Sequence, residues 1–277
     1  MSPPFPPGLT GRGSSPLVSA ILPVYNGEKY LAETLESLLA QTWPALEVIA
    51  VDDESADLSP AILAAYREKF GGRLQVLRIP NSGVSTARNT GVERARGLYI
   101  AFIDQDDLWA PEKVARQVSA LIGSRSRISF TNTAIIDAAG RVRSPHACRF
   151  PAGDRVDWFE TVLFDPVVGI SGVMMERALF LEAGGFRPEF TLAEDYDLLL
   201  EIFSREEPEV VDEDLLLYRE HPGSATRTRA GVLVREARVI LGKWRERRPE
   251  VFRRNRARYL ELRLKLLFLR LRARLGR

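Results

Sequence analysis

The chain has 277 residues, of which 45% are hydrophobic and 27% are charged, an ordinary composition for a globular protein. Its single cysteine, Cys148, excludes an intrachain disulfide, and its two histidines are too few for a poly-histidine metal site, so we expect a reducing, cytoplasmic compartment. No apolar run approaches the roughly 18 residues of a membrane span, and the proline-rich start lacks the basic and apolar regions of a signal peptide.

Charge is distributed unevenly along the chain. From Thr226 to Arg277 there are 18 lysines and arginines but only 4 acidic residues, whereas the rest of the chain carries more acidic than basic residues. An acidic body with a basic tail indicates that the two parts meet different partners. We predict a disordered proline-rich segment over residues 1–16, a globular domain over 17–225 and a basic, amphipathic helical tail over 226–277.

Strand patterns and helix patterns alternate between Val18 and Ile103, with short loops between them. Apolar runs predict the strands, and leucines at helical spacing predict the helices. This alternation is typical of an α/β protein with a Rossmann-like, doubly wound, mostly parallel sheet. The predicted strands span residues 18–24, 46–51, 74–79 and 98–103, and the predicted helices span 28–41, 62–70 and 85–95.

The pattern is less regular beyond Pro111. We predict helices over residues 111–122, 178–183 and 196–203, and strands over 128–132 and 168–176. Residues 133–166 show neither period and are predicted to be irregular.

The most informative segment is the apolar run of residues 100–103, which ends in Asp104-Gln105-Asp106-Asp107. Ligands of open α/β sheets bind just beyond the carboxyl ends of the strands, and a second predicted strand also ends in two acids, Asp52-Asp53. Crowded carboxylates repel one another unless a cation or several donors offset their charge, and Mg²⁺ binds one or two carboxylates together with substrate phosphates. The alternative is an acidic turn that caps the following helix.

Two further segments face the same predicted edge of the sheet. The first strand ends in Pro23-Val24-Tyr25-Asn26, and an aromatic ring beside carboxylates suits a nucleoside. Residues 81–89 form a glycine-containing loop that enters a helix, where backbone N–H groups and Arg88 would suit an anion. The alternatives are a partly buried aromatic at a strand end and an ordinary helix cap.

Seven motifs, in their order along the chain, resemble those of the family 2 inverting glycosyltransferases with the GT-A fold. The resemblance covers roughly Leu17 to Thr226, with one departure, because the family usually has glycine where this chain has Glu54. The motifs are Val-Ser-Ala-Ile-Leu-Pro-Val-Tyr-Asn-Gly from Val18, Val-Asp-Asp-Glu-Ser from Val51, Ser-Thr-Ala-Arg-Asn-Thr-Gly from Ser85, Phe-Ile-Asp-Gln-Asp-Asp-Leu-Trp from Phe102, Gly-Gly-Phe from Gly184, Ala-Glu-Asp-Tyr-Asp from Ala193 and Tyr-Arg-Glu-His from Tyr218.

The resemblance implies roles for the acidic residues. Asp52 would contact the base or ribose, and Asp104-Gln105-Asp106 would be the Asp-x-Asp motif. Asp104 would lie nearer the ribose, and Asp104 and Asp106 are the predicted ligands of a divalent metal, Mg²⁺ or Mn²⁺, at the diphosphate. The predicted nucleotide-sugar site comprises Pro23, Val24, Tyr25, Asn26, Asp52, Arg88, Asp104, Gln105, Glu194 and His221.

The pair Glu194-Asp195 has two interpretations. Inverting transfer needs one carboxylate to accept the proton of the acceptor hydroxyl, and the resemblance implies that Asp195 does so. The alternative is an ordinary acidic N-terminus of a helix. For His221 the resemblance implies a contact with the diphosphate or metal, and the alternative is a structural loop histidine.

The basic tail is predicted to be helical because its residues are helix formers. At 100° per residue, its last segment has one apolar face over Leu260, Leu264, Leu267, Phe268, Leu271 and Leu275 and an opposite one over Leu262, Leu266 and Leu269. Two faces imply two partners: one face would pack on the globular body, and the other would meet an anionic membrane or a protein partner, such as a second copy of the chain. The alternative is a solvated helix folded onto its own domain, and nucleic acid is disfavoured by the acidic body.

Together these patterns predict an inverting, metal-dependent glycosyltransferase. It would move a sugar from a nucleotide-diphospho-sugar, with UDP the expected nucleotide, to a hydroxyl of a glycan or glycolipid in cell-surface polysaccharide or glycolipid synthesis. We expect it in the cytoplasm, peripheral at the inner face of the membrane. The alternatives are a non-catalytic member of the same fold, which binds a nucleotide sugar or a partner, and a nucleotidyltransferase.

Overall fold

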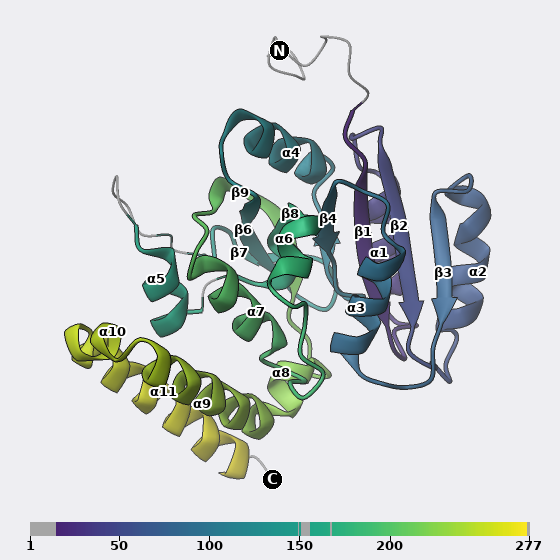
Figure 1. Cartoon of the computed structure of the whole chain (residues 1–277). Coiled ribbons are helices and arrows are strands. Elements are labelled where there is room, and N and C mark those ends of the chain that lie inside the picture. The colour runs from purple at the N-terminus through teal and green to yellow at the C-terminus, as the bar shows by residue number, and fades with distance from the viewer. Residues whose placement is uncertain (1–14, 149, 151–155, 167, 276–277) are drawn as a thin grey trace.

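The computed structural model describes residues 15–148, 150, 156–166 and 168–275, and most of the segment predicted to be disordered lies outside these ranges. The described residues form one nine-stranded sheet with helices on both faces (Figure 1). Its strands are β1 (Val18–Val24), β2 (Leu46–Asp52), β3 (Leu74–Arg78), β4 (Tyr99–Phe102), β5 (Leu108–Trp109), β6 (Ile128–Ile136), β7 (Val142–Ser144), β8 (Val173–Glu176) and β9 (Glu209–Arg219). Their order in the sheet is β3-β2-β1-β4-β8-β6-β9-β5, and β7 pairs with β6.

The first half of the sheet has the predicted α/β architecture. Strands β3, β2, β1 and β4 are parallel neighbours, and every residue of β1, β2 and β4 is buried, as expected for apolar strands covered on both faces. The helices α1 (Leu31–Leu39), α2 (Ser59–Lys69) and α3 (Val84–Arg94) connect them. Parallel strands point the same way, so the chain leaves β1, β2 and β4 at one edge.

The second half of the sheet is mixed. Strand β8 runs antiparallel to both β4 and β6, while β6 and β9 are parallel. The strand predicted over residues 168–176 is shorter, because Ile170–Gly172 form a 3₁₀ turn before β8.

The stretch predicted to be irregular, residues 133–166, holds more structure than expected. It contains the end of β6, all of β7 and α5 (Trp158–Phe164). The eleven-residue β9 was not predicted from the sequence either. Its acidic residues Asp212, Glu213 and Asp214 interrupt the apolar pattern where the register with β6 shifts, which hides the strand.

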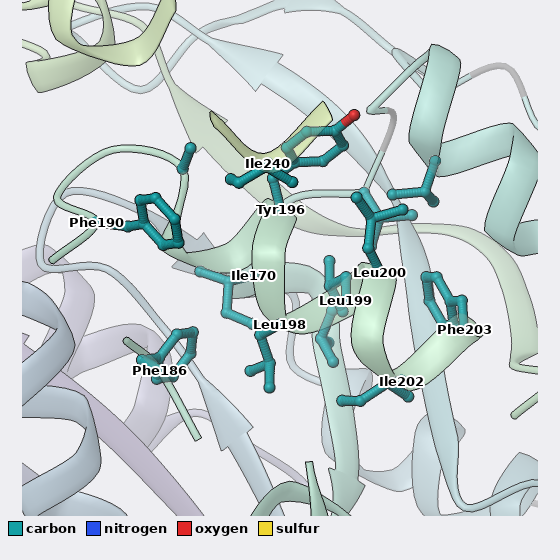
Figure 2. Close-up of a cluster of buried hydrophobic side chains, with 14 of the residues drawn as sticks. Ile170, Phe186, Phe190, Tyr196, Leu198, Leu199, Leu200, Ile202, Phe203 and Ile240 are labelled. Carbon is teal, nitrogen blue, oxygen red and sulfur yellow. The ribbon is translucent and has the colours of Figure 1, made fainter. Parts of the chain in front are cut away.

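Two hydrophobic cores lie on opposite faces of the sheet. Alternate residues of β1 contribute to different cores: Ile21 packs with α3 and α7 (Glu194–Phe203), whereas Ala20 and Leu22 pack with α1 and α4 (Lys113–Gly123). Figure 2 shows the larger core around α7, where Ile170, Phe186 and Leu199 lie among the labelled side chains. The short α6 (Arg177–Glu182) completes this face.

The tail forms helices, as predicted, and packs along α5 and α7 (Figure 1). It comprises α8 (Ala225–Thr228), α9 (Ala230–Arg247), α10 (Pro249–Arg254) and α11 (Arg256–Leu275). On α11, Leu262 and Leu266 are buried in the larger core, whereas the side chains of Leu260, Leu264, Leu267 and Phe268 are exposed. Of the described helices, none has the length and apolarity to cross a membrane.

Ion pairs join α9 to α7. Lys243 Nζ lies 2.6 Å from a carboxylate oxygen of Asp197 and 2.9 Å from one of Glu201, and Arg247 pairs with Glu201 as well. These carboxylates are nearly buried, so the contacts are screened less than surface pairs. The tail therefore supports the helix that carries Glu194 and Asp195.

Candidate active site

A cleft of about 1490 Å³ lies at the carboxyl ends of β1 and β4. Loops after these strands, the start of α3, the start of α7 and the segment after β9 all contribute to its wall. Of the predicted site residues, Pro23, Val24, Tyr25, Asn26, Arg88, Asp104, Gln105, Asp106, Glu194, Asp195 and His221 line the cleft, and Asp52 does not.

Arg88 links two carboxylates from distant parts of the chain. Its guanidinium nitrogens lie 2.6 Å from Glu194 Oε1 and 2.5 Å from Asp104 Oδ1, and the side chain is only 3% exposed. Gly83, with a φ of 86°, lets the chain turn sharply into α3. Arg88 Nε and Glu194 Oε2 are buried without a hydrogen-bond partner among the described residues, so one donor and one acceptor of this ion pair stay unused.

Asp195 lies beside this ion-pair network, in the first turn of α7. Its Oδ1 accepts a hydrogen bond of 2.7 Å from the backbone N–H of Tyr196. Burial, followed by the charge of Glu194, raises the pKa of Asp195 from 3.8 to about 7, against the opposing effect of Arg88. A carboxylate with this pKa is matched to proton transfer near neutral pH.

A pH profile tests this environment. A base must be deprotonated, so kcat/KM should rise with pH up to about pH 7 and level off above it.

The effect of pH on stability has the opposite sign. A carboxyl whose pKa is raised on folding stabilises the fold when protonated, and this contribution is lost as the pH rises through about 7. Urea unfolding at pH 5 and pH 8 should show that Asp195→Asn gains more stability relative to the unchanged chain at pH 8 than at pH 5. An equal difference at both values would contradict the raised pKa.

The Asp104–Asp107 segment is held from several sides. Asp106 Oδ2 lies 3.0 Å from His221 Nε2, and the ring of His221 is tilted against that of Tyr30. Burial and the neighbouring Asp104 raise the pKa of Asp106, and His221 opposes this shift. Asp107 is buried and accepts a hydrogen bond from the backbone N–H of Arg219, and its pKa is raised well above the usual range by burial and by Asp106.

Gln105 joins the acidic segment to the end of β1. Its side-chain amide accepts from the N–H of Tyr25 at 2.8 Å and donates to the carbonyl of Tyr25 at 3.0 Å. A Cβ on Gly27 would lie 2.3 Å from Gln105 Oε1, so any other residue there would push the Gln105 amide out of this position. The ring of Tyr25 is half exposed at the cleft, and Asn26 Oδ1 accepts from the N–H of Ala56.

The two acids after β2 have different surroundings. The Asp52 carboxylate is buried against Arg78, at 2.6 Å, and the N–H of Ser55, whereas Asp53 lines the cleft. The Asp53 carboxylate accepts from the N–H groups of Ser82 and Gly83, and so fixes the loop before α3. The predicted role of Asp52 stays a prediction. Asp53 lines the cleft but was not among the predicted site residues. The alternation of side chains along an extended strand is the signal that could have distinguished these two neighbours.

Glu54 adopts a left-handed backbone conformation, with a φ of 63°. Glycine adopts this conformation without a steric cost, which is a physical reason for glycine at this position in the motif. The Glu54 side chain is exposed, and its carboxylate accepts from the N–H of Asn81. It does not line the cleft, so its bulk is directed away from the predicted nucleotide site.

The predicted metal site was compared with the residues present. In the part of the chain that the structure describes, no group of three or more His, Cys, Asp or Glu side chains is arranged to hold a metal ion. Asp106 and His221 nevertheless place an oxygen and a nitrogen donor side by side. Because Mg²⁺ is commonly bound by one or two carboxylates plus substrate phosphates and water, this pair fits a metal that binds together with a diphosphate.

Glu236 of α9 holds the loop that precedes Glu194. Its carboxylate accepts hydrogen bonds of 2.9 to 3.1 Å from the backbone N–H groups of Thr191, Leu192 and Ala193, and a further one from the Thr191 hydroxyl. Glu236 is buried, so these bonds are charge-assisted and shielded from water. No sequence motif marks this residue, because its main partners are backbone atoms more than forty residues away.

Removing this carboxylate should misplace Asp195. We expect Glu236→Ala to lower kcat by about tenfold with little change in donor KM, since small displacements of a catalytic group are costly. Glu236→Gln, which keeps one acceptor oxygen, should lie between Glu236→Ala and the unchanged chain. Glu246→Ala, at an exposed position of α9, is the control. Equal kcat values in all four proteins would show that the loop is held by other contacts.

Comparison with solved structures identifies the fold class. Staphylococcus aureus TarS residues 1–349, solved with UDP-GlcNAc, superimposes with a TM-score of 0.67 at 23% identity, over 81% of this chain and 66% of that one. A further TarS structure, with UDP, gives a TM-score of 0.64. The α/β sheet is that of a GT-A glycosyltransferase fold, as the motifs predicted.

Comparison of sequences identifies the family. Residues 19–176 match the family model of glycosyl transferase family 2, and the chain belongs to this family. TuaG of Bacillus subtilis, named for glycosyl transfer in teichuronic acid biosynthesis, is 35% identical over 163 residues, 58% of this chain and 63% of TuaG. The uncharacterized glycosyltransferase EpsJ of the same strain is 30% identical over 234 residues, 76% of this chain and 63% of EpsJ. The chain thus spans just under two thirds of the length of each.

Proposed function

We propose that the protein transfers a sugar from a nucleotide-diphospho-sugar, with UDP as the nucleotide, to an acceptor hydroxyl with inversion at the anomeric carbon. The observation that carries this proposal is Asp195, a carboxylate with a pKa of about 7 that lines the cleft next to the Arg88 network. The UDP-GlcNAc and UDP complexes of TarS support the class of donor.

The proposed step is a single displacement. The acceptor hydroxyl gives its proton to Asp195 while its oxygen forms a bond to the anomeric carbon. The bond from that carbon to the diphosphate breaks, and the nucleoside diphosphate leaves with the electron pair. Arg88 keeps Glu194 and Asp104 in place beside Asp195.

The leaving group gains negative charge in this step. We propose that Asp104 and Asp106, with His221 beside Asp106, would hold a divalent metal, Mg²⁺ or Mn²⁺, which would stabilise this charge as a Lewis acid.

The metal proposal has a direct test. Chelation with EDTA should abolish activity and weaken UDP binding, and Mg²⁺ or Mn²⁺ should restore both. Asp106→Asn should weaken metal-dependent UDP binding at least ~10-fold in calorimetric titrations, since one carboxylate ligand is lost. UDP binding that is equal with and without metal would contradict this assignment, without affecting the assignment of Asp195.

The acceptor is proposed to belong to cell-surface polysaccharide or glycolipid synthesis, supported by the name of TuaG. We further propose peripheral binding at the inner face of the membrane through the exposed leucines of α11 and the basic residues of the tail. The full chain should then sediment with anionic liposomes at low salt and be released at high salt. A salt-insensitive dimer that ignores the liposomes would instead make this face a protein interface.

Product analysis tests the proposed function as a whole. A panel of nucleotide sugars is incubated with the full chain, and the released products are separated. Free nucleoside diphosphate supports glycosyl transfer, and UDP-sugars should release it fastest. Release of pyrophosphate would indicate nucleotidyl transfer. If no donor yields either product, the protein binds its ligand without turnover.

A further inference from the structure

The cleft continues from the proposed catalytic carboxylate into an apolar arm. Alongside Asp104, Asp106 and Asp195, the same cavity is lined by side chains of α9 and α11 and by residues around α5. This apolar lining comprises Val162, Val168, Leu233, Ala237, Leu241, Leu262, Leu266 and Leu269. At about 1490 Å³ the whole cleft exceeds the roughly 300–1,000 Å³ of a usual small-molecule pocket, so it has room for more than a nucleotide sugar.

The arm is lined by both buried and exposed apolar side chains. Val162, Leu241 and Leu266 line it and are each less than 9% exposed, so this part of the arm offers an apolar surface that is largely shielded from water. Leu269 is 39% exposed, and the neighbouring Lys265 is exposed too and pairs with Glu261. These residues mark the mouth of the arm at the surface of α11.

The surroundings of the mouth indicate where an occupant comes from. The outer face of α11 carries exposed Leu264, Leu267 and Phe268. The tail from Thr226 holds 18 basic and only 4 acidic residues, so its charge complements anionic amphiphiles and the surface in which they gather.

The arm is also connected mechanically to the proposed catalytic loop. Leu233 and Ala237 line it from α9, and Glu236 of the same helix holds residues 191–193, directly before Glu194. Tyr196 and Leu199, in the helix that Asp195 opens, line the same cavity. Figure 2 shows both side chains in the core around α7, with Ile240 of α9.

We propose that this arm binds the hydrocarbon chain of an amphiphilic acceptor, whose hydroxyl-bearing head reaches Asp195. The acceptor class is thus a lipid-linked saccharide rather than a free sugar. The role of the bound molecule as an acceptor rests on the proposed function. Binding of a hydrocarbon chain in the arm does not depend on it.

Binding is measured calorimetrically with the full chain, using dodecyl phosphate and butyl phosphate as probes below their micelle concentrations. Dodecyl phosphate should bind at least ~10²-fold more tightly, because each buried methylene adds to affinity. Ala237→Phe fills the arm and Leu269→Glu places a charge at its mouth, so both should remove this difference. The matched controls are Val239→Phe, at an exposed position of α9, and Leu264→Glu, on the outer face of α11.

Each outcome decides a separate point. Equal binding of the two probes, or tight dodecyl phosphate binding that survives Ala237→Phe and Leu269→Glu, would overturn the proposal. Loss in Leu264→Glu alone would move the amphiphile to the outer face of α11 and overturn it as well. In parallel, dodecyl glycosides should raise nucleoside diphosphate release more than the matching methyl glycosides. Release from the donor alone reports the proposed function separately, and it should persist in the control variants Val239→Phe and Leu264→Glu.

Discussion

Asp195→Asn is expected to lower kcat by at least ~10²-fold, the range for removal of a general base. Asparagine has nearly the same shape and can still accept the hydrogen bond from the N–H of Tyr196, but it cannot take up a proton. Binding of UDP, measured by calorimetry, should stay within about threefold of the unchanged protein, because Asp195 acts on the acceptor side. The variant separates chemistry from binding.

Glu189→Gln is the control for this experiment, because Glu189 is an exposed acid close to Asp195 in the sequence. It should have normal turnover. If Asp195→Asn kept near-normal kcat at saturating acceptor, Asp195 would be an acidic helix start and not the base.

Arg88→Met should be the most destabilising single change in the cleft. It removes the cation between Asp104 and Glu194 and leaves the Glu194 carboxylate buried without its partner. Breaking one side of a buried ion pair costs about 3–5 kcal/mol, which urea unfolding can measure. Arg116→Met is the matched control: Arg116 pairs with Glu213 at 3.6 Å with both side chains about half exposed, so the cost should be about 1 kcal/mol or less.

A double variant identifies the cause of that loss. Adding Glu194→Gln to Arg88→Met removes the uncompensated charge, so the double variant should be more stable than Arg88→Met alone. If it is less stable, Arg88 contributes through packing against Phe186, which lies under its guanidinium at 5.3 Å, rather than through charge.

The sequence predicted the first half of the fold well. The strands from β1 to β4 are fully or largely apolar and are separated by short loops and amphipathic helices, so local pattern and tertiary environment agree. The second half was harder, since β9 contains three acids in its middle and pairs with β6 through a shifted register. A strand whose neighbours determine its state leaves little local signal.

Most of the predicted site residues line the cleft, because many of them follow strands at one edge of the sheet. Arg88, Asp104 and Glu194 are far apart in sequence, and the structure brings them together. Asp52 and Glu236 show what could not be predicted from the sequence. The direction of the Asp52 side chain depends on Arg78 in the next strand, and Glu236 acts through backbone N–H groups that no motif records.

The tail shows a similar division. Its helical state and its two apolar faces follow from composition and a 100° period, and Leu262 and Leu266 pack inward while Leu260 and Leu264 stay exposed. Its ion pairs with Asp197 and Glu201 could not be predicted, because the tail has many basic residues and the sequence does not show which of them pair with these two acids.

The central claim is a single displacement of a nucleoside diphosphate assisted by Asp195. The most direct measurement follows donor hydrolysis by proton NMR, with water as the acceptor, so no knowledge of the natural acceptor is needed. An α-linked UDP-sugar should give UDP and, before mutarotation, the β-anomer of the free sugar, and Asp195→Asn should slow this release. Initial release of the α-anomer, or release of pyrophosphate in place of UDP, would contradict the proposed mechanism.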